Sequence, residues 1–340
     1  MTTKLNILDP EPSADNVGFS LSEESDGIEL NDLNANANGG TEMMQRGLYE
    51  RLPDDIKDEV QIICSRVRNI DTHRPTILWL HDLFMDPEAQ HLSDENSRKR
   101  FDRLVFVSDW QWNTYHLAHG IPHAEAVTFK NCIEPIPTHT KQNDRINLIY
   151  HTTPHRGLEI LVPVYKELSK KYGDSVHLDV YSSFNAYGWP QRDEPYKELF
   201  EEIEQHDHMT YHGYQPNDVV RKAIEEAHIF AYPSIWQETS CIAAMEAMSG
   251  GLGVVCPAYA ALPETTANLG YMYQFHHDPN VHANIFASAL NSVVDLFQNN
   301  YENIVNRLQF QKAYADNFYN WDIRAKEWET LIRKILEHKK

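Results

Sequence analysis

The stretch that decides how this chain folds runs from Glu238 to Glu264 and reads ETSCIAAMEAMSGGLGVVCPAYAALPE. An apolar run at residues 228–232 precedes it, and the pair Gly250–Gly251 is followed by a second apolar run at 252–256. Short apolar runs bounded by turn residues are typical of buried strands, and glycine typically ends a helix. The order of these segments therefore predicts a strand, a loop, a helix and a second strand.

Two carboxylates flank the start of the predicted helix. Glu238 falls in the loop and Glu246 falls about two turns into the helix, roughly 12 Å further along its axis. Between them, Thr239, Ser240 and Cys241 open the helix, where free N–H groups and the positive end of the dipole suit a diphosphate. Carboxylates accept hydrogen bonds from vicinal diols. This arrangement fits the two ends of a sugar nucleotide better than a single metal ion or an acid–base pair.

The pattern resembles the nucleotide-sugar site of the retaining GT-B glycosyltransferases of family 4, described as glycosyl transferases group 1. That family combines a Pro-Ser strand end, a glutamate, seven residues and a second glutamate with small residues, a second strand and a Pro-Glu turn. The matching residues here are Pro233–Ser234, Glu238, Glu246, residues 247–251, Val254–Val255 and Pro263–Glu264. The resemblance implies an α/β fold with two Rossmann-like doubly wound domains and a cleft between them.

Strand and helix patterns alternate along most of the chain, which predicts parallel sheets covered by helices. Strands are expected at 59–64, 76–81, 104–107, 124–129, 146–150, 176–181, 209–211, 228–232 and 254–255. Helices are expected at 41–52, 109–119, 157–172, 195–205, 215–226 and through most of the chain after 279. Residues 4–8 are expected to form a first strand, and the acidic segment 13–38 is expected to be mainly a loop.

The proline-containing polar run at 135–145 predicts a linker between two domains. An acceptor-side domain would take residues 1–138, and a nucleotide-sugar-binding domain would take residues 145–321. In the GT-B fold the last helix often crosses back onto the first domain. The resemblance therefore adds residues 322–340 to the acceptor-side domain.

The resemblance also implies roles for residues outside the opening stretch. Gly39 and Gly40 match a glycine-rich loop that faces the donor phosphates, although that loop usually lies nearer the N-terminus. His81 matches a histidine beside the reacting carbon of the donor sugar, and Arg156 takes the place of a diphosphate-binding lysine. Tyr214 follows a turn that commonly lies beside the base, where it could stack or simply pack.

Within the same resemblance, Glu246 would bind the ribose hydroxyls and Glu238 the hydroxyls of the donor sugar. His81, Glu238 and Arg156 form the expected catalytic set, and residues 239–241 complete the donor site. The chain departs from the family at one position. The usual arginine upstream of Arg156 is absent, because Tyr150–His151–Thr152 stands there.

Composition narrows the possible partners. The net charge of −20 argues against non-specific nucleic-acid binding and allows at most peripheral membrane contact. No apolar run is long enough to span a bilayer, no signal peptide is visible, and the four cysteines are scattered. These features predict a cytoplasmic protein with reduced thiols.

The 18 histidines include no metalloprotease or zinc-finger pattern. No cofactor is expected, and the resemblance implies that catalysis needs no metal ion.

The expected activity is that of a retaining hexosyltransferase. It would move a sugar from a UDP- or GDP-sugar to an acceptor hydroxyl, on a glycan or a lipid-linked glycan. A nucleotide-sugar hydrolase, a phosphorylase and a catalytically silent nucleotide-sugar-binding protein are the alternatives. The sequence leaves the base, the sugar, the acceptor and the oligomeric state open.

Overall fold

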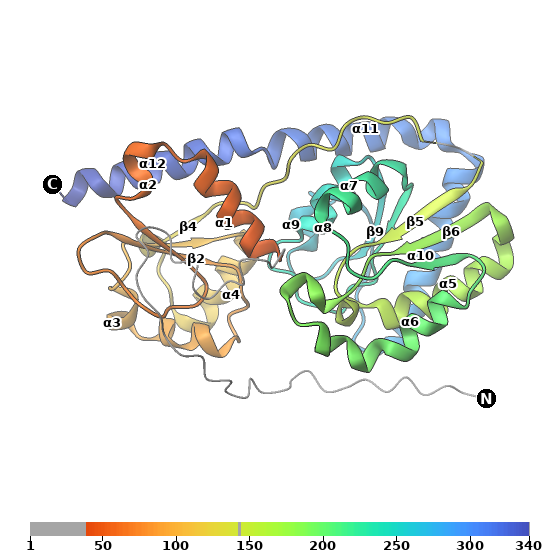
Figure 1. The fold of residues 1–340 in the computed structure, drawn as a ribbon, viewed down its shortest axis with the longest axis horizontal. Helices are drawn as coiled ribbons and strands as arrows, with labels where there is room; N and C mark the ends of the chain where they lie inside the picture. The colour runs from red at the N-terminus through yellow and green to blue at the C-terminus, as the bar shows by residue number, and fades with distance from the viewer. Residues whose placement is uncertain (1–38, 142–143, 340) are drawn as a thin grey trace.

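A computed structural model describes residues 39–141 and 144–339 as two lobes, each built on a parallel sheet (Figure 1). The strand expected at residues 4–8 and the loop expected at 13–38 lie outside the described residues. The two sheets confirm the expected α/β class, and most expected strands and helices lie within two residues of the observed ones.

The first sheet has the order β1-β2-β3-β4, with all described neighbours parallel. Its strands are β1 (Gln61–Cys64), β2 (Thr76–Leu80), β3 (Arg103–Phe106) and β4 (Ala126–Thr128). The helices of this lobe are α1 (Gly40–Arg51), α2 (Asp54–Lys57), α3 (Glu95–Arg98) and α4 (Asp109–His119).

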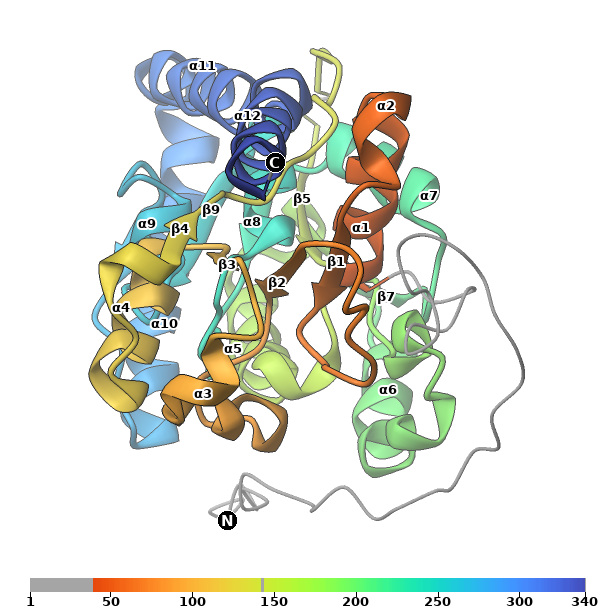
Figure 2. The ribbon, with the colours of Figure 1, turned by 90° about the vertical axis from the view of Figure 1, so that its left-hand side faces the viewer.

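Both faces of the first sheet are buried. In β2, Ile77 and Trp79 point into a core shared with α1 and α12, while Leu78 and Leu80 point into a second core with α4. Figure 2 shows α12 and α1 on one side of the sheet and α3 and α4 on the other. Burial on both faces explains why residues 77–80 of β2 form a continuous apolar run, as is usual for parallel strands.

The second sheet has the order β10-β9-β8-β5-β6-β7 and is parallel throughout. Its strands are β5 (Ile146–Tyr150), β6 (Val176–Val180), β7 (Met209–Tyr211), β8 (Ile229–Ala231), β9 (Gly253–Pro257) and β10 (Tyr271–Tyr273). Its helices are α5 (Leu158–Tyr172), α6 (Lys197–Glu204), α7 (Asn217–Glu226), α8 (Ile242–Ser249), α9 (Leu262–Thr265) and α10 (Pro279–Asn299). Because the chain winds outward from β5 in both directions, this sheet is doubly wound.

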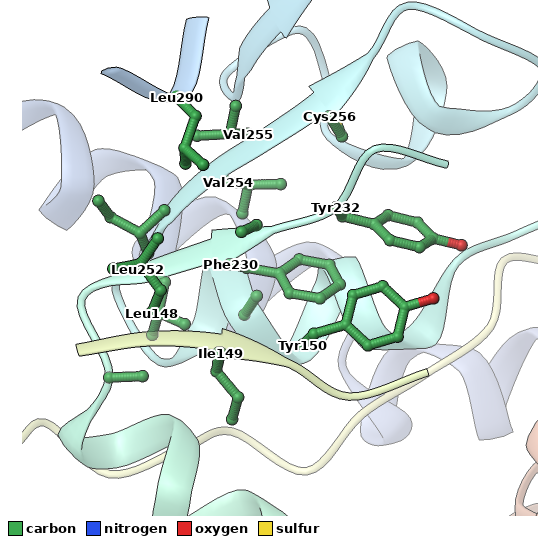
Figure 3. Packing of buried hydrophobic residues seen from close by; sticks show 14 of the residues in the cluster. Leu148, Ile149, Tyr150, Phe230, Tyr232, Leu252, Val254, Val255, Cys256 and Leu290 are labelled. Atoms are coloured by element: carbon green, nitrogen blue, oxygen red, sulfur yellow. The ribbon is translucent and has the colours of Figure 1, made fainter. Parts of the chain in front are cut away.

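The core of the second sheet ends in two tyrosines. Leu148 and Phe230, at the centre of β5 and β8, are fully buried. Tyr150 and Tyr232 follow at the carboxyl ends of these strands, with ring centroids 6.1 Å apart. Figure 3 shows their hydroxyl groups pointing in the same direction, beyond the strand ends. Their apolar rings therefore close the core, and their hydroxyls reach the loops where a ligand would bind.

The last two helices span both lobes. Helix α11 (Tyr301–Phe318) packs against α8, and α12 (Trp321–Lys339) continues back over the first sheet (Figure 1). Trp328 and Ile332 of α12 are fully buried in the core of the first sheet. This crossing is the one that the GT-B resemblance implies, while the exact domain boundaries stay a prediction.

Two further properties bear on the sequence expectations. Each of the four cysteines lies in the described part of the chain and carries a free thiol. Among the described residues, no helix combines the length and the apolar character needed to cross a bilayer.

Candidate functional site

The candidate site lies where the winding of the second sheet reverses. Strands β5 and β8 are neighbours, but β5 continues to β6 on one side and β8 to β9 on the other. The loops after β5 and β8 therefore diverge at the carboxyl edge of the sheet, and ligands of open α/β sheets bind at such a point. These loops carry Arg156 and Glu238.

A glycine brings the two loops into contact. Gly157 has φ +122°, and a Cβ at this position would lie 2.2 Å from the carbonyl oxygen of Pro233. Only glycine fits this combination of conformation and space. The Ile235 N–H donates to the Arg156 carbonyl at 3.4 Å, so the backbones run side by side just before Glu238.

The half-buried Arg156 forms an ion pair with the buried Glu238. Arg156 Nη1 donates to Glu238 Oε1 at 2.6 Å, and the Tyr232 hydroxyl donates to the same oxygen. Burial lowers the pKa of Arg156, but the Glu238 carboxylate and the neighbouring acidic groups together outweigh burial and raise that pKa well above its ordinary value. Arg156 is therefore a permanent cation with its counter-ion 2.6 Å away.

One nitrogen of this guanidinium lacks a hydrogen-bond partner among the described residues. Arg156 Nη2 donates to the Tyr187 hydroxyl at 3.3 Å, whereas the buried Nε has no hydrogen-bond partner among the described residues. A buried donor without a partner is costly, so a phosphate oxygen at this position would be stabilising. Tyr187 lies in the loop after β6, and no sequence motif had indicated it.

The motif helix begins later than expected. Helix α8 starts at Ile242 with Cys241 as its N-cap residue, so Glu246 lies about one turn inside it. The expectation of two turns was wrong, because residues 239–240 belong to the loop. Thr239 and Ser240 precede the helix and are half-buried, and no side chain of the described residues caps the first turn.

Glu246 lies on the buried side of α8. Its carboxylate accepts a hydrogen bond from Arg221 Nη1 at 2.9 Å. Burial raises the pKa of Glu246, and the charge of Arg221 opposes that shift. Arg221 is a second residue that sequence reasoning missed, since one arginine on an amphipathic helix carries no signal of its own.

The first lobe contributes His81 at the end of β2. Its carbonyl oxygen accepts a hydrogen bond from Thr239 Oγ1 at 2.8 Å, which ties the two lobes together at the site. The His81 ring lies 4.7 Å from Trp79, and its buried Nε2 has no hydrogen-bond partner within residues 39–141 and 144–339. Burial lowers the pKa of His81 to about 3, so the imidazole is neutral near pH 7.

Gly39 and Gly40 also face the second lobe. A Cβ on Gly40 would lie 3.1 Å from Ile242 Cδ1, and a Cβ on Gly39 would lie 2.7 Å from the Tyr187 ring. The glycine pair thus approaches the start of α8 as the resemblance implies. Tyr214, by contrast, is half-buried in the turn between β7 and α7, and its contact with a base stays a prediction.

A second contact holds the carboxyl edges of the two sheets together. Both oxygens of Glu264, on α9, accept hydrogen bonds at 2.8 Å from the backbone N–H groups of Asp109 and Trp110. These groups open α4, whose dipole favours a carboxylate. Lys130, beyond β4, forms an ion pair with the same carboxylate.

A comparison of the sequence with models of known protein families identifies the family of this chain. Residues 136–307, about half of the chain, match the model described as "Glycosyl transferases group 1". The chain belongs to this family. The match contains Arg156, Glu238 and Glu246, whereas Gly39, Gly40 and His81 precede it.

Solved structures share the fold of this group 1 glycosyltransferase. The pneumococcal O-GlcNAc transferase GtfA, solved with UDP and GlcNAc, has a TM-score of 0.63 at 13% identity. The alignment covers 86% of this chain and 60% of GtfA. A glycosyltransferase from Rickettsia africae has a TM-score of 0.64 at 13% identity, with 89% and 84% of the two chains covered.

HepE of Anabaena, solved with UDP and glucose, has a TM-score of 0.62 at 12% identity, with coverage of 86% and 81%. A search by sequence among curated proteins finds no match. At these identities the likeness concerns the fold alone, and it confirms the predicted GT-B class.

Within the described residues, no three His, Cys, Asp or Glu side chains gather in a way that could hold a metal ion. Whether this family member needs a metal ion for turnover stays a prediction.

Proposed function

We propose that the protein transfers a sugar from a nucleotide diphosphate sugar to an acceptor hydroxyl with retention of the anomeric configuration. The observation that carries this proposal is the position of Arg156. Its buried guanidinium lies at the switch point of the second sheet, paired with Glu238, while Thr239 of the same loop is bonded to His81 of the other lobe. A diphosphate at this point would be shared by both lobes.

Each residue then has a defined task. Glu246 accepts hydrogen bonds from the ribose hydroxyls, and Glu238 accepts them from the donor sugar. Negative charge grows on the leaving diphosphate as the glycosidic bond breaks. Arg156 and the N–H groups that open α8 stabilise that charge, since they are in place before the reaction.

His81 contributes as a neutral group. Because burial lowers its pKa to about 3, it can offer a hydrogen bond to the donor sugar but no positive charge. The acceptor, a glycan or a lipid-linked glycan, would enter from the first lobe, where the backbone of Gly39 and Gly40 approaches Tyr187 and Ile242 of the second lobe. UDP- and GDP-sugars are the proposed donors, and the cytoplasm is the proposed location.

One observation favours the alternative of a silent or hydrolytic nucleotide-sugar-binding protein. In the loop at 151–157, Arg156 is the sole arginine or lysine. Burial lowers the pKa of His151 to about 4, so His151 adds no charge near pH 7. The diphosphate would then depend on a single cation that Glu238 already neutralises in part.

Thermal shift assays with UDP, GDP, ADP, TDP and their sugar conjugates test the donor class first. A ligand at a hundred times its dissociation constant adds about 2.7 kcal/mol, equivalent to a shift of about 4 °C for a chain of 340 residues. The donor identified in this way is then incubated with candidate acceptors. NMR of the anomeric proton distinguishes retained transfer from hydrolysis, and binding without turnover would support the silent alternative.

Two variants test the site assignment. Glu246→Ala should weaken nucleotide binding through loss of the ribose contact. Glu238→Ala should lower turnover more than it lowers nucleotide affinity. Unchanged kinetics in both variants would contradict the assignment.

A further inference from the structure

Arg221 connects the predicted ribose-binding glutamate with the crossing between the lobes. It lies on α7, and its Nη1 donates to Glu246 Oε1 at 2.9 Å. Its Nη2 donates to the carbonyl oxygens of Glu134 and Pro135, at 2.8 and 3.1 Å. One planar guanidinium therefore holds a carboxylate of the site and the backbone of residues 133–136, here called the connecting segment.

The connecting segment is held from both lobes. At its start, Ile133 pairs with Asn320, between α11 and α12. The side chain of Glu134 forms an ion pair with Arg51 at the end of α1. Movement of one lobe against the other must therefore strain this segment or break one of its contacts.

The motif helix contacts the same segment a second time. The Ile136 N–H donates to Ser249 Oγ, in the last turn of α8, at 2.8 Å. Lys312 of α11 donates to the carbonyl oxygens of Ile136 and Ser249. Helix α8 thus reaches the connecting segment at two points about one turn apart, through Arg221 beside Glu246 and directly through Ser249.

The planar guanidinium of Arg221 can bind the Glu246 carboxylate and the carbonyl oxygens of the connecting segment at the same time. The side chains of Arg221 and Glu246 are 18% and 6% exposed, so solvent screens their interaction only weakly. The guanidinium offers donors in a fixed fork, which a lysine cannot reproduce. A ribose diol that donates to Glu246 competes with Nη1 for the same carboxylate, and this changes how firmly Arg221 is held against the carbonyls.

We propose that Arg221 is a positioning residue that orients Glu246 for the ribose diol and couples occupancy of the nucleotide site to the connecting segment. This inference rests on the proposed function. Coupling between two sites is reciprocal, so a nucleotide that alters the Arg221 contacts must also alter the relative freedom of the two lobes.

Calorimetric titration with UDP, GDP and their 2′-deoxy forms tests the positioning role. The wild type should bind its preferred nucleoside diphosphate at least about tenfold more tightly than the 2′-deoxy form, since loss of one hydroxyl leaves a buried acceptor unpaired. In Arg221→Met this preference should collapse to about twofold or less, and Arg221→Lys should recover part of it. The control is Lys222→Met, an exposed neighbour on α7 that should keep the full preference.

The outcomes separate the two proposals. Binding of neither UDP nor GDP by the wild type would remove the proposed function, and this inference with it. Ribose discrimination that stays intact in folded Arg221→Met and Arg221→Lys would overturn the inference and leave the proposed function standing. A merely structural role would weaken ribose and deoxyribose forms equally, and that result would also overturn the inference.

Distances between spin labels test the coupling. Labels at Leu117→Cys on α4 and Val281→Cys on α10 report on the two lobes, and both native side chains are exposed. The preferred nucleotide should shift the distance distribution in the labelled wild type and in Lys222→Met. It should cause no shift in Arg221→Met, even at saturating nucleotide. An equal shift in all three proteins would refute the coupling.

Discussion

The ion pair between Arg156 and Glu238 should be essential for stability as well as for ligand binding. Its nitrogen and oxygen are 2.6 Å apart, and the two side chains are 21% and 5% exposed. Glu238→Ala leaves the Arg156 cation buried without its counter-ion. Removal of one partner of a buried ion pair typically costs about 3–5 kcal/mol. At about 1.5 °C per kcal/mol for a chain of 340 residues, the melting temperature should fall by about 4–8 °C.

Urea unfolding followed by circular dichroism measures this cost, and a double-mutant cycle assigns it. Arg156→Met alone should also destabilise, because it leaves the Glu238 carboxylate buried. The double variant should be more stable than the sum of the single losses predicts, by about 1–3 kcal/mol. The matched control is Glu167→Ala, which removes an ion pair between side chains that are 73% and 68% exposed. It should cost less than about 1 kcal/mol.

The ligand provides an independent check of the same reasoning. A diphosphate would give Arg156 a new counter-ion, so the preferred nucleotide should stabilise Glu238→Ala at least as strongly as it stabilises the wild type. The reasoning would be refuted if Glu238→Ala lost no more stability than Glu167→Ala. Additive losses in the double-mutant cycle would refute it as well.

Two other predictions concern the elements around the site. Gly157→Ala should lower the unfolding free energy by about 1–3 kcal/mol, because Gly157 has φ +122° and contacts Pro233. The control is Gly173→Ala, where φ is +52° and no atom of the described residues lies within 4 Å of the added Cβ. It should cost less in the same urea assay. Burial lowers the pKa of His81 from 6.5 to about 3, so the stability due to its neutral form is complete above pH 6.5 and lost as pH falls toward 3. Between pH 6.5 and 4.5, the unfolding free energy of His81→Phe should therefore fall less steeply with pH than that of the wild type. The difference in slope should correspond to at most one bound proton, and equal slopes in the two proteins would contradict the prediction.

Much of the architecture was readable from the chain, because its signals are local. The apolar residues at 146–150 coincide with β5, a central strand that is largely buried, and the short strand expected at 209–211 coincides with β7 at the edge of the same sheet. Helix α4 coincides with the expected 109–119 because Ser108 caps its start and Gly120, at φ +65°, ends it. The start of α8 was missed, because nothing in residues 239–241 marks which of them caps the helix.

Local sequence patterns could not predict which residues of the site contact each other. Glu238 and Glu246 were found from their spacing, yet their partners Arg156 and Arg221 lie 82 and 25 residues away. Tyr187 was missed entirely, although it lies beside both Arg156 and Gly39. Each of these contacts depends on how loops from different strands meet, and no local pattern encodes that meeting.

Spacing, turn residues and apolar periodicity along the chain thus determined the α/β class, most of its elements and the two glutamates of the motif, because each follows from neighbours in sequence. The tertiary structure decided which cation faces which carboxylate, that the Nε2 of His81 is buried and its imidazole neutral, and that Arg221 joins Glu246 to the connecting segment. These properties arise from burial and from distances between residues far apart in the chain, and they exist only once the two sheets have packed together.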